Sequence, residues 1–193
     1  KKIFDNKNFL ILGPGKNLFL SNKKILKFIE KKKPFVICLN TVNAIDEKKV
    51  DLRVACHPIR ILSDLKFHNS LKTKLAIPYS MMLKNIRSQI KLNKRQILDY
   101  GLSIKYNSEI KIMSKYCIMT NPLAIGYCLA MLASAKIKSK NIFLAGFDGY
   151  EAKNSDIDET EKLINSFKKK FFKKKLMSLT STRYTALSFL KKF

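Results

Sequence analysis

Residues 8–17 read NFLILGPGKN, and this stretch decides the expected fold. A strand is expected over 8–12, because residues 9–12 are apolar without alternation, which is typical of a short strand that is buried on both faces. Gly13-Pro14-Gly15 ends this strand, and Ser21 is the expected cap of a following helix. A second apolar run without alternation lies at 35–39. Two buried strands joined by a glycine loop and a helix indicate a parallel sheet covered on both faces.

The rest of the chain continues the alternation of strands and helices. Further strands are expected at 52–56, 74–77, 141–145 and 176–179, and further helices at 80–90, 123–136, 156–170 and 182–192. The remainder of 79–116 is polar and weakly periodic, so we predict irregular structure there. The predicted fold class is α/β and Rossmann-like, with a mostly parallel sheet and helices on both faces. One domain is expected over 9–193, with 1–8 as a linker or the end of a preceding domain.

Composition bounds the class of protein. The chain has 193 residues, 46% of them hydrophobic, which is enough for one continuous core. No apolar run reaches the roughly 18 residues that span a bilayer, and the first residues lack a signal-peptide pattern. We therefore expect a cytoplasmic protein. The four cysteines are far apart in apolar surroundings, which indicates buried reduced thiols rather than a zinc site.

The formal net charge of +25 favours an anionic ligand or an anionic lipid surface. Only five basic residues are arginines, the side chain that reads bases and phosphates bidentately, so no specific nucleic-acid partner is expected. Residues 167–175 read FKKKFFKKK. We favour a helix end whose aromatic rings face the core, and the alternative is a peripheral contact with the inner membrane.

The glycine loop after the first strand is the first candidate site. Glycines at 13 and 15 let the backbone approach a phosphate closely, and the amides of a following helix stabilise its charge. The predicted phosphate-binding residues are Gly13, Pro14, Gly15, Lys16 and Asn17. The alternative is a tight turn that binds nothing.

Polar residues also follow the second and third strands. In a parallel sheet, ligands bind at the carboxyl ends of the strands. Asn40 and Asn43 follow the second strand, and their amides can pair with a base edge or a ribose hydroxyl. His57 and Arg60 follow the third. His57 is a candidate general base, although a structural hydrogen bond is the alternative, and Arg60 can pair with a phosphate or carboxylate.

The run 146–150, GFDGY, directly follows a buried strand. Asp148 is a candidate base or hydroxyl ligand, Tyr150 a candidate phosphate donor, and Gly146 part of the binding turn. The alternative is a glycine-rich turn that Asp148 caps. Thr120 and Asn121, which can cap the helix after Pro122, complete the predicted nucleotide site.

These motifs are similar to those of the bacterial sialyltransferases that act on lipooligosaccharide, and of related domains from surface-polysaccharide gene clusters. The likeness lies in Gly13-Pro14-Gly15, Asn40, the run 120–135, the run 141–150 and the ending 185–190. The stretch 62–115 is unmatched. The AGFDGY form at 145–150 also resembles a domain fused to lyase-type aldolases.

The resemblance implies a CMP-linked sugar donor, held by the first loop and Asn40, a glycan acceptor, and no metal or cofactor. It implies that Tyr150 contacts the departing phosphate. The family's catalytic His precedes its last helix, whereas residues 178–182 contain no His. Two hypotheses follow: a glycosyltransferase of surface-glycan biosynthesis with Asp148 or His57 as base, or a non-catalytic nucleotide or sugar-phosphate binding module beside a partner enzyme such as an aldolase.

Overall fold

The computed structural model describes residues 2–4, 8–106, 109–137, 141–149, 155–170 and 176–190. Within these residues eight strands form one sheet in the order β11-β10-β9-β1-β2-β3-β4-β5, and every neighbouring pair is parallel. The predicted α/β, Rossmann-like fold is thereby confirmed. The strands are β1 Phe9–Leu12, β2 Phe35–Leu39, β3 Leu52–Val54, β4 Lys74–Ile77, β5 Ile97–Asp99, β9 Ile142–Ala145, β10 Leu176–Ser178 and β11 Ser188–Phe189.

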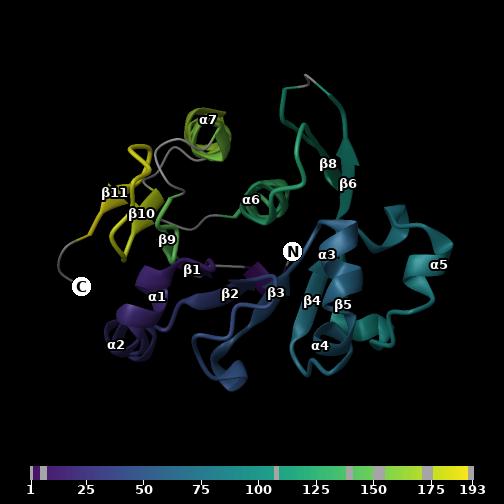
Figure 1. Ribbon diagram of the computed structural model, residues 1–193, viewed down its shortest axis with the longest axis horizontal. Helices are drawn as coiled ribbons and strands as arrows, with labels where there is room; N and C mark the ends of the chain where they lie inside the picture. The colour runs from purple at the N-terminus through teal and green to yellow at the C-terminus, as the bar shows by residue number, and fades with distance from the viewer. Residues whose placement is uncertain are drawn as a thin grey trace.

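Helices cover both faces of this sheet. They are α1 Lys16–Leu20, α2 Asn22–Lys32, α3 Pro58–Ser63, α4 Leu65–Asn69, α5 Lys84–Arg87, α6 Ala124–Ser134 and α7 Ser155–Lys170, with 3-10 turns η1 Lys2–Phe4, η2 Glu47–Lys49, η3 Tyr79–Met81 and η4 Lys94–Gln96. Side chains alternate along each strand. Leu10 and Leu12 pack with α1 and α2, whereas Phe9 and Ile11 pack with α6 and α7 on the other face (Figure 1).

The strand order reverses at β1. From β1 the chain runs outward through β2, β3 and β4 to β5, and it then returns to place β9 on the other side of β1. β1 therefore pairs with β2 along one edge and with β9 along the other. A reversal of this kind leaves a crevice at the carboxyl ends of the two central strands.

The stretch 79–116 is more regular than the sequence predicts. A second sheet, in the order β6-β8-β7, contains β6 Gly101–Ile104, β8 Tyr116–Met119 and β7 Lys111–Ile112. The helix predicted at 80–90 is confined to the single turn of α5. Its extension is opposed by side chains, because the Asn85 carbonyl accepts hydrogen bonds from Ser88 Oγ and Gln89 Nε2.

The helix predicted at 182–192 is wrong over its described residues, 182–190. β11 occupies two of these positions, and the rest form turns and irregular backbone. Side chains of α7 hold this segment: Glu161 accepts a hydrogen bond from the Ala186 amide at 2.6 Å, and Lys168 Nζ donates to the Ala186 carbonyl at 2.6 Å. A helix would need both backbone groups for its own hydrogen bonds.

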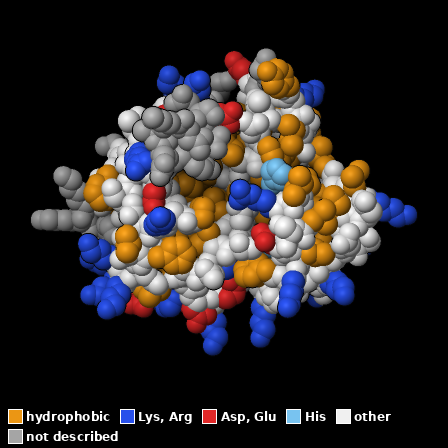
Figure 2. Space-filling model, viewed as in Figure 1, with side chains coloured by type: hydrophobic (Ala, Val, Ile, Leu, Met, Phe, Trp, Pro, Cys, Tyr) orange, Lys and Arg blue, Asp and Glu red, His pale blue; other side chains and the backbone are white. Residues whose placement is uncertain are grey.

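Several features predicted from composition can be compared with the structure. The four cysteines are free and buried, as predicted, and burial raises the pKa of the Cys38 thiol to about 12. Phe167 is buried against the core, as favoured, while 171–175 lie outside the described residues. The described helices include none long and apolar enough to cross a membrane. On the face seen in Figure 2, Lys and Arg side chains are spread around the rim instead of forming one patch.

Candidate functional site

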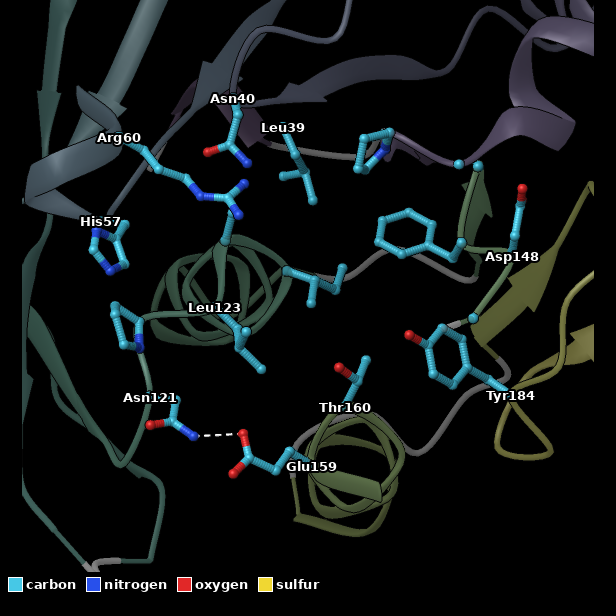
Figure 3. A pocket seen from close by; sticks show the side chains of 18 residues that line it. Leu39, Asn40, His57, Arg60, Asn121, Leu123, Asp148, Glu159, Thr160 and Tyr184 are labelled. Carbon is cyan, nitrogen blue, oxygen red and sulfur yellow. Dashed lines mark hydrogen bonds between the residues drawn. The ribbon is translucent and has the colours of Figure 1, made fainter. Parts of the chain in front are cut away.

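A pocket of about 660 Å³ opens at the carboxyl edge of the sheet, where the strand order reverses. The segments after β1, β2, β3 and β9 form one side of it. The start of α6, the start of α7 and Tyr184 form the other side (Figure 3). Ligand pockets in proteins have volumes of roughly 300–1,000 Å³, so this pocket has the size of a small-molecule site.

Eight of the predicted site residues line this pocket, namely Pro14, Gly15, Asn40, His57, Arg60, Asn121, Gly146 and Asp148. Five others do not line it, namely Gly13, Lys16, Asn17, Asn43 and Thr120. Tyr150 lies outside the described residues. Each of the eight either follows the end of a parallel strand or lies in the turn before α6. The topology thus brings together residues that are far apart in the sequence.

On the side of β1 and β9, Asp148 is bonded to the chain itself. Its Oδ2 accepts a hydrogen bond from the Asn17 amide at 2.8 Å. The carboxylate therefore accepts from one of the amides expected to hold a phosphate, in the first turn of α1 and not in its own turn at 146–150. Its Oδ1 is buried without a hydrogen-bond partner in the described structure. A Cβ on Gly15 would lie 2.5 Å from this oxygen, so glycine is what lets the carboxylate approach the loop.

The segment 180–184 forms further hydrogen bonds with the turn after β9. Thr180 Oγ1 accepts a hydrogen bond from the Gly146 amide at 3.0 Å, and Thr182 Oγ1 donates to the Phe147 carbonyl at 2.5 Å. The Arg183 amide donates to the Asp148 carbonyl at 2.9 Å. These bonds hold the turn after β9 from behind. They also bring Tyr184, which is almost fully buried, to the wall of the pocket.

On the side of β3, the polar side chains are less engaged. His57 precedes α3, and its Nδ1 is buried without a hydrogen-bond partner in the described structure. Arg60 is exposed on α3, and its guanidinium likewise has no hydrogen-bond or ion-pair partner among the described residues. Figure 3 shows this guanidinium reaching into the pocket below Asn40. Among the described residues that line the pocket, Arg60 is therefore the cation that a ligand would meet.

Asn40 takes its position from an unusual backbone. Its φ is 50°, in the left-handed region that asparagine tolerates better than most residues. Its amide donates to the Val54 carbonyl at 2.8 Å, and its carbonyl accepts from Arg53 Nη1 at 3.1 Å. Arg53 is buried and also pairs with Glu47 at 2.5 Å. The end of β2 is thus fixed from behind, which leaves the Asn40 side chain toward the pocket.

Comparisons of the chain with models of protein families, with curated proteins and with solved structures found no match. The site must therefore be interpreted from its own geometry.

Four lining residues carry polar groups or bulk that the sequence did not single out: Leu123, Glu159, Thr160 and Tyr184. Glu159 Oε2 accepts a hydrogen bond from Asn121 Nδ2 at 2.5 Å across the pocket (Figure 3). The Tyr184 hydroxyl points into the cavity. For Glu159, the sequence shows only that position 159 lies in the first turns of an amphipathic helix. This pattern does not distinguish a residue of a pocket wall from one on a solvated face.

The polar run KFHNS at 66–70 suggests a surface loop for His68, and this interpretation is wrong. His68 lies in α4 and is 1% exposed. Burial lowers the pKa of its imidazole, although the nearby Asp64 carboxylate acts in the opposite direction. His57 is consequently the one histidine of the chain that lines the pocket. The described residues contain no group of three or more His, Cys, Asp or Glu side chains that could hold a metal ion.

Proposed function

We propose that the pocket binds a nucleotide sugar and that the protein is a glycosyltransferase of bacterial surface-glycan biosynthesis, with a CMP-linked sugar as the favoured donor. The observation that carries this proposal is the unpaired Arg60 guanidinium in a nucleotide-sized pocket at the reversal of the strand order. Planar guanidinium groups bind phosphate oxygens through two parallel hydrogen bonds.

The distribution of charge in the pocket supports a ligand with two different ends. Arg60, Asn40 and His57 gather at one end, whereas Asp148 and Glu159 lie away from them (Figure 3). A phosphate fits beside Arg60 and would be repelled by the carboxylates. Sugar hydroxyls donate readily to a carboxylate such as that of Glu159, whereas the Asp148 carboxylate is already bonded to the chain. A nucleotide sugar combines a phosphate with a hydroxyl-rich ring, so it fits this distribution better than a free phosphate.

The second candidate function is a binding module without catalysis, which holds a nucleotide or sugar phosphate beside a partner enzyme such as an aldolase. The bonding of Asp148 favours it, because a carboxylate engaged by the Asn17 amide in the turn is poorly placed to take a substrate proton. Both candidates use the same pocket and the same contact with Arg60. They differ only in turnover.

Binding and hydrolysis of CMP-, UDP- and GDP-sugars by the full chain test the proposal. Arg60→Ala should weaken binding of the preferred nucleotide sugar roughly 10- to 100-fold, because a hydrogen bond to a charged group contributes about 1.5–3 kcal/mol. Calorimetric titration measures the affinity, and release of the free nucleotide measures turnover.

Arg95→Ala is the matched control, because Arg95 is an exposed arginine that does not line the pocket. It should leave the affinity unchanged. Equal losses in the two variants would mean that the general charge of the surface attracts the ligand, and the pocket would then lose its assignment. Tight binding without turnover for any donor would establish the binding module instead.

A further inference from the structure

A second pocket, of about 750 Å³, adjoins the first, and the two share Asn121, Leu123 and Glu159 in their walls. It lies between α7 on one side and the end of β8 and the residues before β7 on the other. The hydrogen bond between Asn121 and Glu159 joins the two sides at this shared wall. Molecules bound in the two pockets would therefore meet at Glu159.

The face of α7 that lines the second pocket is polar. Glu159, Lys162, Ser166 and Lys169 follow one another at spacings of three, four and three residues, which places them on one side of the helix. The opposite side, with Ile164 and Phe167, is buried in the core. Polar residues on an outward face ordinarily meet only water, but here they form the wall of a cavity.

The lining of the second pocket differs in charge from the rest of the protein. The chain has 39 Lys and Arg residues against 14 Asp and Glu. The described residues that line this pocket include two of each sign, because Lys162 and Lys169 are matched by Glu109 and Glu159. A strongly anionic ligand would meet repulsion from the two glutamates as well as attraction from the two lysines. The balanced lining instead fits a neutral ligand.

Hydroxyl and amide groups complete this lining. Thr120, Asn165 and Ser166 supply donors and acceptors, and the apolar side chains of Ile110 and Met119 lie among them. A sugar ring presents hydroxyls at its edge and C–H groups on its faces. The mixture of polar and apolar side chains matches both.

We propose that the second pocket binds a neutral saccharide, which is the acceptor of the proposed transfer, and that Glu159 is the general base at the junction. This inference rests on the proposed function of the first pocket. Glu159 Oε2 is bonded to Asn121, and Oε1 has no partner in the part of the chain that the structure describes. The free oxygen is available for an acceptor hydroxyl.

The reaction balances without any further reagent. The acceptor oxygen forms a bond to the anomeric carbon of the donor sugar as its proton passes to the Glu159 carboxylate. The bond between the anomeric carbon and the phosphate oxygen breaks, and its electron pair leaves with the nucleotide. Asn121, which donates to Oε2, orients the carboxylate and is a positioning residue.

Binding to the second pocket is tested with lactose, maltose and chitobiose as neutral probes and sulfated lactose as an anionic one, by saturation-transfer NMR on the full chain. The neutral probes should bind and the sulfated one should bind more weakly. Ser166→Phe, which fills only the second pocket, should abolish this signal and leave the affinity for nucleotide sugars within about twofold. Asn165→Ala should weaken saccharide binding several-fold without adding bulk.

Ser70→Phe is the control, because Ser70 is exposed at the end of α4 and lines neither pocket. Absence of saccharide binding to the unmodified chain, or equal binding by Ser166→Phe with a retained melting temperature, would overturn the acceptor site. Saccharide binding with no nucleotide-sugar binding would instead retain this site and refute the function proposed for the first pocket.

The role of Glu159 has its own readout. Glu159→Gln keeps the shape of the side chain and a group that can bond to Asn121, so KM for the saccharide and Kd for the nucleotide sugar should change by less than about threefold. Turnover should fall by about 10²- to 10⁴-fold, the usual contribution of a general base. Unchanged turnover in this variant, or no transfer by the unmodified chain with any donor and probe, would overturn the assignment.

Discussion

The two ends of the first pocket differ in whether their polar groups are already hydrogen-bonded by the protein itself. At the ends of β1 and β9, the chain satisfies most of its own groups, since Asp148 bonds the Asn17 amide and Thr180 and Thr182 bond the backbone of the turn. At the end of β3, the side chains of His57 and Arg60 have no hydrogen-bond partner within the described structure. We call the first the closed end and the second the open end.

This difference separates the parts of the site that preserve its shape from those that are available to a ligand. A buried donor or acceptor without a partner costs roughly 1–3 kcal/mol. A group that the protein leaves unpaired is therefore one that a ligand can bond favourably. Most groups at the closed end already have partners, and Asp148 Oδ1 is the exception. Changes there should therefore affect stability first, whereas changes at the open end should affect ligand binding first.

The largest effect is expected from Gly15→Val at the closed end. The new Cβ would lie 2.5 Å from Asp148 Oδ1 and 2.6 Å from the Gly146 carbonyl oxygen, and the latter is backbone that cannot rotate away. Forced overpacking costs about 1–3 kcal/mol, and we expect the upper end of this range. Urea denaturation followed by circular dichroism measures the loss. An unchanged midpoint would show that the closed end is not rigid, and the comparison would fail.

A smaller effect is expected from Asp148→Ala. The substitution removes the acceptor for the Asn17 amide and should lower the free energy of unfolding by about 1 kcal/mol, the usual contribution of a cap. Asp148→Asn keeps an oxygen for this amide and should cost less. Urea denaturation measures these losses as well. Arg60→Ala, at the open end, should leave the free energy of unfolding unchanged. A larger loss in Arg60→Ala than in Asp148→Ala would contradict the distinction between the closed and the open end.

The smallest effect concerns pH and His68, which is buried in α4. Burial lowers the pKa of this imidazole in the folded chain below its ordinary 6.5, with Asp64 opposing and Arg53 reinforcing the shift. The unfolded chain therefore binds the proton first as pH falls, and stability is lost through and below pH 6.5. One proton gives at most about 0.7 kcal/mol between pH 7 and pH 6.

His68→Gln should remove this part of the pH dependence, measured as the difference in urea midpoint between pH 7 and pH 6. His57→Gln is the control at the pocket wall. An identical slope in His68→Gln and the unmodified chain would mean that the buried imidazole takes up its proton without unfolding.

The sequence predicted most of the polar residues at the open and closed ends of the pocket. It predicted few of the residues in the opposite wall. The bounds predicted for β2 and β4 agree with the structure, because each is an apolar run with a proline or a polar turn beside it. Strand ends in a parallel sheet share an edge, so Asn40, Arg60 and Asp148 could be grouped before any coordinates. Glu159 and Tyr184 could not, because their approach depends on how α7 and the segment after β10 pack.

The second sheet was missed for a different reason. β7 has two residues, and β6 and β8 have four each with partly exposed side chains. β8 is an apolar run of only four residues, and β6 contains Gly101 and Ser103, so neither segment carries a pattern long enough to predict a strand. The backbone pairing that defines them is therefore visible only in three dimensions.

The pairing of β1 with β9 has a consequence for how the protein acquires its shape. The hydrogen bond between Asn17 and Asp148 joins residues 131 positions apart, and the loop that it closes contains most of the chain. Closing such a loop has an entropic cost that only a nearly complete chain can offset. During synthesis, β1 would emerge first and keep an unpaired edge of apolar residues until β9 arrives. The nascent protein is thus most prone to aggregation before β9 pairs with β1 and forms the crevice. Because the crevice forms last, ligand binding requires that the sheet is complete.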